Sequence, residues 1–425
     1  MLRPAILSGI ILTMASGASA PLAESPEKML QGAIYRAKVM GDLPGAIQQF
    51  EAIVTKYSGK PVAGRALLEI GQAEEQLGHP DRANQAYVRI LKGYPEQAKL
   101  VARLHQNREL TIDAALNSRR LTWFSPRTPV APPARCCMGM SHDASNHTIV
   151  LFGGFTQGKY FGDTWTWHNG WHELSPPNAP TARDGPGLTY DGATGNLVLF
   201  GGVNEARESL NDTWTWDGKT WTQQFPAVSP PPRRFDGTGM VYLPTIRRVV
   251  LFGGVQGRRG LGDTWVWDGL SKTWAQKSLA SSPSPRRTMM AYDATSKVIV
   301  LFGGDAGLPF METTTYLGDT WTFDGTNWTQ HNPTSAPSAR GGAAMAYVAS
   351  LHSVVLFGGI TGRGRRTNDT WLWNGANWRE VTPTDLPPSR VRAGMDYNAS
   401  TDELVLFGGH GTTTLGGTWL FRVSR

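Results

Sequence analysis

The chain has 425 residues, of which 40% are hydrophobic, and this content excludes a wholly disordered protein. Its 49 glycines and 28 prolines favour many turns over long helices. The net charge of +7 includes no basic cluster beyond short pairs, so we expect no nucleic-acid partner. The only two cysteines, Cys136 and Cys137, exclude a disulfide framework.

The first twenty residues have the three parts of a secretory signal peptide. Arg3 gives a positive start, residues 5–15 are apolar, and Ala18-Ser19-Ala20 forms a small-residue cleavage site. The apolar run is too short for a stable membrane span, and we expect no other span. We therefore predict cleavage after Ala20 and export to the periplasm or beyond, with a buried first helix as the alternative.

Residues 21–118 are rich in Ala, Leu, Glu, Gln and Lys, with apolar residues at helical spacing. Gly41 and Ala46 return 37 residues later as Gly78 and Ala83, which indicates two helix hairpins followed by a last helix at about 97–116. The segment resembles the tetratricopeptide repeat of exported bacterial proteins, with three more residues than that family's period. The resemblance implies a possible protein partner, and a spacer that binds nothing is the alternative.

The rest of the chain repeats a longer unit six times. Leu-Phe-Gly-Gly begins at Leu151, Leu199, Leu251, Leu301, Leu356 and Leu406, so the unit is 48 to 55 residues long. Asp-Thr-Trp follows in five units, beginning at Asp163, Asp212, Asp263, Asp319 and Asp369, and the sixth has Gly417 in place of the Asp. In the second unit, alternation and turn residues predict strands at 188–190, 197–200 and 212–216 and a fourth from Trp221, with Gly201-Gly202 ending the second strand.

The strand that completes the sixth unit is expected from the beginning of the repeat region. In five units the second Trp precedes an Arg by 12 residues, as in Trp171 and Arg183, and Trp123 and Arg135 have the same spacing. Residues 121–125 are therefore predicted to be the outer strand of the last unit. The four-stranded units with a Gly-Gly pair resemble the kelch repeat, which implies a six-bladed β-propeller over residues 119–425. The fold class is thus mainly β, with a small α-helical domain first.

Two sets of arginines are the candidate ligand-binding residues. The first set recurs where each connection between blades enters a strand, as in eukaryotic kelch adaptors that bind peptides there: Arg135, Arg183, Arg233, Arg286, Arg340 and Arg390. The alternative is that each Arg stabilises the fold by pairing with the Asp of Asp-Thr-Trp. The sixth unit weakens this alternative, because it has Gly417 in place of that Asp. The second set lies in the loops after Gly-Gly and would form a basic rim: Arg258, Arg259, Arg363, Arg365 and Arg366. His410 opens such a loop in the last unit.

These residues favour an exported, non-enzymatic binding or scaffold protein that holds a protein or acidic glycan on the loops of the propeller. His168 and His172 are four residues apart but flank a predicted hairpin turn, so we expect no metal and no cofactor. A carbohydrate-active propeller enzyme is the alternative, of the sugar epimerase or oxidase type. The chain matches only the repeat scaffold of the bacterial sialic acid epimerases, and it lacks the extra domains and the seventh blade of galactose oxidase.

Overall fold

The computed structural model describes residues 25–77, 79–94, 120–235, 237, 239–306 and 315–424. The chain divides into two compact units, Met1–Leu116 and Asn117–Arg425. The signal peptide expected at residues 1–20 and the helix expected at 97–116 lie outside the described residues. Within the described ranges, no helix is long and apolar enough to cross a membrane.

The first unit contains four described helices: α1 (Pro26–Lys38), α2 (Leu43–Lys56), α3 (Pro61–Gln76) and α4 (Pro80–Gly93). Each begins with a proline in its first turn, where the missing N–H is not needed for helical bonding. The Asp42 side chain caps α2 by accepting a hydrogen bond from the Gly45 N–H at 3.0 Å. Gly41, at φ +70°, makes the left-handed turn between α1 and α2.

Small residues let these helices pack closely. Ala46 and Ala83 are fully buried, together with Phe50 and Ile90. A Cβ at Gly71 would lie 2.3 Å from the Tyr87 ring, so α3 and α4 meet where no larger side chain fits. The repeated sequence positions therefore form one shared helical core.

The second unit is a six-bladed propeller, and each blade is an antiparallel sheet of four main strands. Blade one contains β2 (Gly139–Asp143), β3 (Thr148–Phe152), β6 (Thr164–Trp167) and β7 (Trp171–Leu174), and blade two β8 (Gly187–Asp191), β9 (Asn196–Val203), β10 (Ser209–Trp216) and β11 (Trp221–Gln224). Blade three contains β12 (Met240–Leu243), β13 (Arg248–Phe252), β16 (Thr264–Asp268) and β17 (Thr273–Lys277), and blade four β18 (Arg287–Asp293), β19 (Val298–Asp305), β20 (Tyr316–Phe323) and β21 (Trp328–His331).

Blade five contains β23 (Ala344–Val348), β24 (Ser353–Thr361), β25 (Arg366–Trp373) and β26 (Trp378–Val381), with the short β22 (Arg340–Gly341) on β24. Blade six contains β27 (Gly394–Asn398), β28 (Glu403–Phe407), β29 (Thr418–Ser424) and β1 (Arg120–Phe124). Two hairpins extend from loops: β4 (Phe155–Thr156) with β5 (Lys159–Tyr160), and β14 (Val255–Gln256) with β15 (Arg259–Gly260).

The glycine pair of blade two lies inside a strand, whereas the sequence predicted that it ends one. β9 continues through Gly201 and Gly202 to Val203, and its pairing with β10 shifts register there. Both glycines have positive φ, and a Cβ on Gly201 would lie 2.5 Å from the Arg233 carbonyl oxygen of the next blade. The pair is therefore a bulge at which neighbouring blades touch through their backbones.

Aromatic rings join each blade to the one before it. The outer-strand Trp of each blade packs on the Phe of the preceding Leu-Phe-Gly-Gly, with ring centroids 5.0–5.3 Å apart. Its indole N–H donates to the Thr of the preceding Asp-Thr-Trp or, for Trp171, to Thr418 of blade six, at 2.8–3.4 Å. Every blade interface therefore has the same apolar contact and the same buried hydrogen bond.

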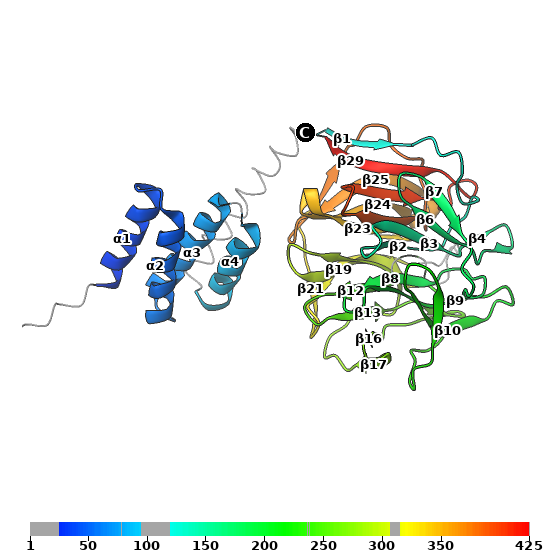
Figure 1. Ribbon diagram of the computed structural model, residues 1–425, viewed down its shortest axis with the longest axis horizontal. Helices are drawn as coiled ribbons and strands as arrows, with labels where there is room; N and C mark the ends of the chain where they lie inside the picture. Colours follow the sequence, from blue (N-terminus) through cyan, green and yellow to red (C-terminus); the bar gives the residue numbers. More distant parts are fainter. Residues whose placement is uncertain are drawn as a thin grey trace, which may run out of the picture. The chain divides into compact units, whose positions relative to one another are not determined.

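The two ends of the propeller meet in blade six. β1 pairs with β29 along its length, and Trp123 lies opposite Phe421. Figure 1 shows β1, in cyan, beside β29, in red. Trp123 is fully buried between Phe421 and Phe357 of blade five, so the last blade is closed by the first strand of the propeller.

We expect Trp123→Ala to lower the free energy of unfolding by ~3–5 kcal/mol, because it removes a buried ring from the strand that closes the propeller. Urea unfolding measures this change. Phe225→Ala is the control, since Phe225 is 83% exposed and its loss should change stability by less than ~0.5 kcal/mol. Equal stability of the two variants would contradict the closing role of β1.

Candidate functional site

The connections between blades and the loops after Gly-Gly meet on one face of the propeller, which we call the loop face. In every blade, the residue after the repeated Arg pairs with the residue after Gly-Gly. The six pairs are Cys136 with Phe155, Asp184 with Val203, Arg234 with Val255, Arg287 with Asp305, Gly341 with Ile360 and Val391 with His410. The longest and most varied loops are therefore held by the rigid strands of all six blades at one end.

Backbone hydrogen bonds also join successive connections around the loop face. The Gly185 N–H donates to the Cys137 carbonyl at 2.8 Å, and the Phe235 N–H donates to the Gly185 carbonyl at 2.8 Å. On the other side, the Cys137 N–H donates to the Arg392 carbonyl at 3.0 Å. These residues each lie two positions after a repeated Arg, so that position lines a shared rim at the inner ends of the blades.

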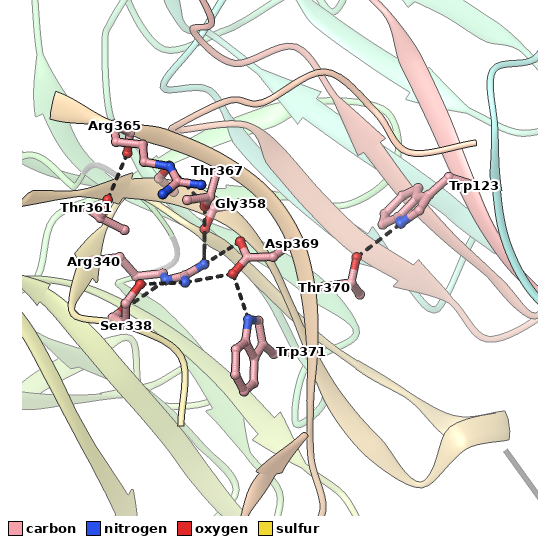
Figure 2. A network of polar contacts seen from close by, with 11 residues as sticks. Trp123, Ser338, Arg340, Gly358, Thr361, Arg365, Thr367, Asp369, Thr370 and Trp371 are labelled. Atoms are coloured by element: carbon pink, nitrogen blue, oxygen red, sulfur yellow. Dashed lines mark hydrogen bonds and ion pairs between the residues drawn. The ribbon is translucent and has the colours of Figure 1, made fainter. Parts of the chain in front are cut away.

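The repeated arginines themselves are buried below this face. In blade five, Figure 2 shows the Arg340 guanidinium held against the Asp369 carboxylate, with Nη1–Oδ1 at 2.7 Å and Nη2–Oδ2 at 2.8 Å. Arg340 also donates to the carbonyl oxygens of Ser338 and Gly358, and the Trp371 indole N–H donates to Asp369 at 2.7 Å. Blades one to four repeat this network with Arg135, Arg183, Arg233 and Arg286.

In four of these pairs the carboxylate is held in its ionised form. Burial raises the pKa of Asp163, Asp263, Asp319 and Asp369, but the hydrogen bonds and charge of the paired guanidinium, with the indole N–H, outweigh burial. Each of these four pKa values is therefore below that of an ordinary aspartate. Each pair therefore joins a guanidinium and a carboxylate of the same blade.

For five of the six repeated arginines, this geometry corrects the prediction that they line a ligand-binding surface. The side chains of Arg135, Arg183, Arg233, Arg286 and Arg340 are at most 1% exposed, and each is paired with a carboxylate in its own blade. These five arginines therefore stabilise the fold, as the alternative interpretation predicted. Arg390 is buried at the corresponding position of blade six, where Gly417 replaces the aspartate.

The second set of arginines lies at the loop tips. Arg258 and Arg259 are exposed on the β14–β15 hairpin of blade three. Arg363 and Arg365 are exposed in the turn between β24 and β25 of blade five, and Arg366 is half-buried at the start of β25. The structure therefore places these residues where a partner can reach them.

His410 lies on the loop face but is tied into its loop. Its backbone bridges Val391 and Thr414, and its Nδ1 lies 2.7 Å from the Gly411 carbonyl oxygen. The side chain is half-buried. Within the part of the chain that the structure describes, no three His, Cys, Asp or Glu side chains gather as metal ligands.

Charged residues at the inner ends of the connections escaped the sequence analysis. Arg234 pairs with Asp184 of the preceding blade at 2.9 Å, and Arg287 pairs with Asp305 of its own blade at 2.7 Å. The nearby hydroxyls of Tyr160 and Tyr316 have raised pKa values because of burial and, respectively, the charges of Asp184 and Asp305. The signal in the sequence was the variation at the position after each repeated Arg and at the position after each Gly-Gly.

The two cysteines lie on the same rim of the loop face as free, buried thiols. Their sulfur atoms are 3.0 Å apart, with Cys137 as the donor. The hydrogen bond with Cys136 and burial both raise the pKa of the Cys137 thiol well above its usual value. The neutral thiol is a poor nucleophile, so Cys137 is a weak candidate for a reactive cysteine.

Comparison with known families finds one similarity, within the propeller. Residues 166–336 match the family described as the KLHDC2/KLHL20/DRC7 Kelch-repeats domain. No curated protein matches the chain significantly. The chain is therefore similar to a kelch-repeat domain from β6 of blade one to the end of blade four.

We expect Asp369→Asn to lower the free energy of unfolding by ~3–5 kcal/mol, because it leaves the buried Arg340 guanidinium without a compensating charge. Chemical denaturation measures the change. Glu380→Gln removes an exposed carboxylate from β26 of the same blade and should alter stability by less than ~0.5 kcal/mol. A similar small effect for Asp369→Asn would show that the ion pair adds nothing to the blade.

The same pairs predict how stability depends on acid. The carboxyl pKa values of Asp163, Asp263, Asp319 and Asp369 are lowered in the folded state. The stabilisation from these pairs is therefore complete above the unfolded value of about 3.9 and is lost as pH falls through the folded values. Burial raises the pKa of Asp191 and Asp293, which act in the opposite direction. The difference in urea midpoint between the native protein and Asp369→Asn should therefore shrink below about pH 4, and a constant difference would contradict the assignment.

Proposed function

We propose that this protein is a binding scaffold whose loop face holds an acidic segment of a protein partner. The pairing of connections and loops in all six blades carries this proposal, because it presents variable loops on a rigid frame. The kelch-repeat match supports a protein as the partner. The residues that would meet it first are the exposed arginines of blades three and five.

Charge on the loop face supports an acidic partner. The buried arginines are neutralised within blades one to five, and Asp184 and Asp305 already contact Arg234 and Arg287. Arg258, Arg259, Arg363 and Arg365 extend beyond these pairs at the tips of two loops. Guanidinium groups at such positions bind carboxylates bidentately and strengthen encounter with an acidic chain.

The helical unit supplies the second part of the proposal, a further protein-binding surface. Tyr35, Val39 and Met40 are large apolar residues at the end of α1 and the turn after it, and each is more than half exposed. Such a group of apolar side chains is suited to contact with another protein. Export of the mature chain, based on the signal peptide expected before Pro21, completes the proposal.

The test compares two variants of the full mature chain that each lose three positive charges. Arg258, Arg259 and Arg365 are changed to Ser in the loop-face variant. Lys219, Lys272 and Lys297, exposed in turns at the opposite ends of blades two to four, are changed to Ser in the control. The probe is a fluorescent glutamate-rich peptide, with binding followed by anisotropy at several salt concentrations.

We expect the loop-face variant to bind this peptide about tenfold more weakly, since three exposed ion pairs at ~0.5 kcal/mol each sum to ~1.5 kcal/mol. Its remaining affinity should depend less on salt, and the control should bind like the native protein. Equal weakening in both variants would indicate general charge attraction and refute a loop-face site. Unchanged melting temperatures of both variants would verify that folding is intact.

A further inference from the structure

Five blades show how this fold holds a carboxylate. In each, the guanidinium Nη1 and Nη2 contact the two aspartate oxygens at 2.5–3.0 Å. The indole N–H of the Asp-Thr-Trp motif donates to one of these oxygens at 2.7 Å in all five. Three donors thus converge on a planar group with two oxygens, which is the geometry of bidentate carboxylate recognition.

Blade six keeps these donors and lacks the carboxylate. Arg390 Nε donates to the Pro388 carbonyl at 3.0 Å, and its Nη1 donates to the Gly408 carbonyl at 2.9 Å. The corresponding arginines make the same two backbone contacts, so the Arg390 guanidinium has the orientation that meets a carboxylate elsewhere. The partner position is Gly417, which has no side chain. We call the space between Arg390, Gly417 and Trp419 the blade-six slot.

The donors of the blade-six slot have no partner within it among the described residues. Arg390 is 2% exposed, and no described carboxylate contacts it. Burial without a counter-charge lowers its pKa to about 10. The Trp419 Nε1 would lie 3.4 Å from a Cβ on Gly417, and no described residue accepts a hydrogen bond from it.

The slot is reachable from solvent. The aspartates that occupy the same position in the other blades are 17–22% exposed. Gly417 and Trp419 are half-buried, so the edge of the slot is open on the same side. A group that enters from outside can therefore reach a buried guanidinium whose charge the protein leaves uncompensated.

We propose that the blade-six slot binds the carboxylate of an external ligand, which takes the place that aspartate fills in the other five blades. One oxygen accepts from Arg390, and the other accepts from Arg390 and the Trp419 indole N–H. The ligand is a small organic acid or an acidic residue of a peptide, since both present the same group. This site is separate from the loop-tip arginines and does not depend on the proposed function.

Acetate is the first probe, with the full mature chain in a buffer free of other carboxylates. Thermal unfolding is compared in sodium acetate and in sodium chloride at equal ionic strength. We expect acetate at saturating concentration to raise the melting temperature by about 2 °C or more over chloride. Equal melting temperatures in the two salts would overturn the proposal, because a slot that holds water or any anion does not select carboxylate.

Two substitutions at Gly417 test whether the slot is the site. The backbone there needs no glycine, and an added Cβ meets nothing closer than 3.4 Å. Gly417→Asp should raise the melting temperature without acetate and abolish the acetate effect, because the new carboxylate occupies the slot. Gly417→Asn has the same size without the charge, and it should abolish the acetate effect with a smaller gain in stability. An acetate effect that persists in Gly417→Asp would place the site elsewhere and overturn the proposal.

Blade five provides the matched positive control. Asp369→Gly creates a second slot beside Arg340 and Trp371, and acetate should recover part of its lost melting temperature beyond the gain of the native protein. A short peptide that contains glutamate is compared with the same peptide containing glutamine. This comparison distinguishes a small organic acid from an acidic peptide as the ligand. If the glutamate peptide binds more tightly than acetate, and this binding is lost in Gly417→Asp, the ligand is a peptide. If the glutamate peptide and acetate bind with equal affinity, the ligand is a small acid. Recovery of Asp369→Gly by acetate, with no response of the native protein, would overturn the proposal for blade six.

Discussion

The propeller depends on one buried ion pair that recurs from blade to blade. Each arginine enters at the start of a blade and contacts an aspartate two strands later, so the pair fixes the connection against the sheet. Its carbonyl oxygen also accepts from the second glycine of the preceding blade, as Arg183 does from Gly154 at 2.9 Å. A single residue thus joins the parts of its own blade and attaches that blade to its neighbour.

The tryptophan ring provides the apolar counterpart of this constraint. Because every outer-strand Trp packs on the preceding Phe and donates to the preceding blade, no blade buries its face alone. Trp123 makes these contacts from the beginning of the propeller, and Trp171 makes them with blade six. Closure therefore uses the same contact as every other interface and leaves no blade without a neighbour.

Residues that recur in every blade and residues that differ between blades have different roles in this fold. Residues that recur in every blade, such as the arginines and the Leu-Phe pairs, are buried and maintain the frame. Residues that depart from the repeat gather at the loop face, as Asp184, Arg234 and Asp305 do, or leave a position empty, as Gly417 does. Departures from the repeat are therefore where a rigid propeller has room for binding.

The blade count and the class of fold followed from the sequence alone, because Leu-Phe-Gly-Gly and the second Trp recur at fixed positions within each unit. The spacing of Trp123 and Arg135 also placed the outer strand of the last blade before the first blade in the chain.

Spacing could not decide where the Arg135 side chain points. Arg135 and Asp163 are 28 residues apart, and only the curved sheet brings them to 2.5 Å. Gly417 argued in sequence against a structural pair, yet Arg390 keeps its orientation because two backbone carbonyl oxygens hold it without the aspartate. Tertiary structure alone decided which arginines are buried and which reach solvent, since that depends on contacts between strands that are distant in the chain.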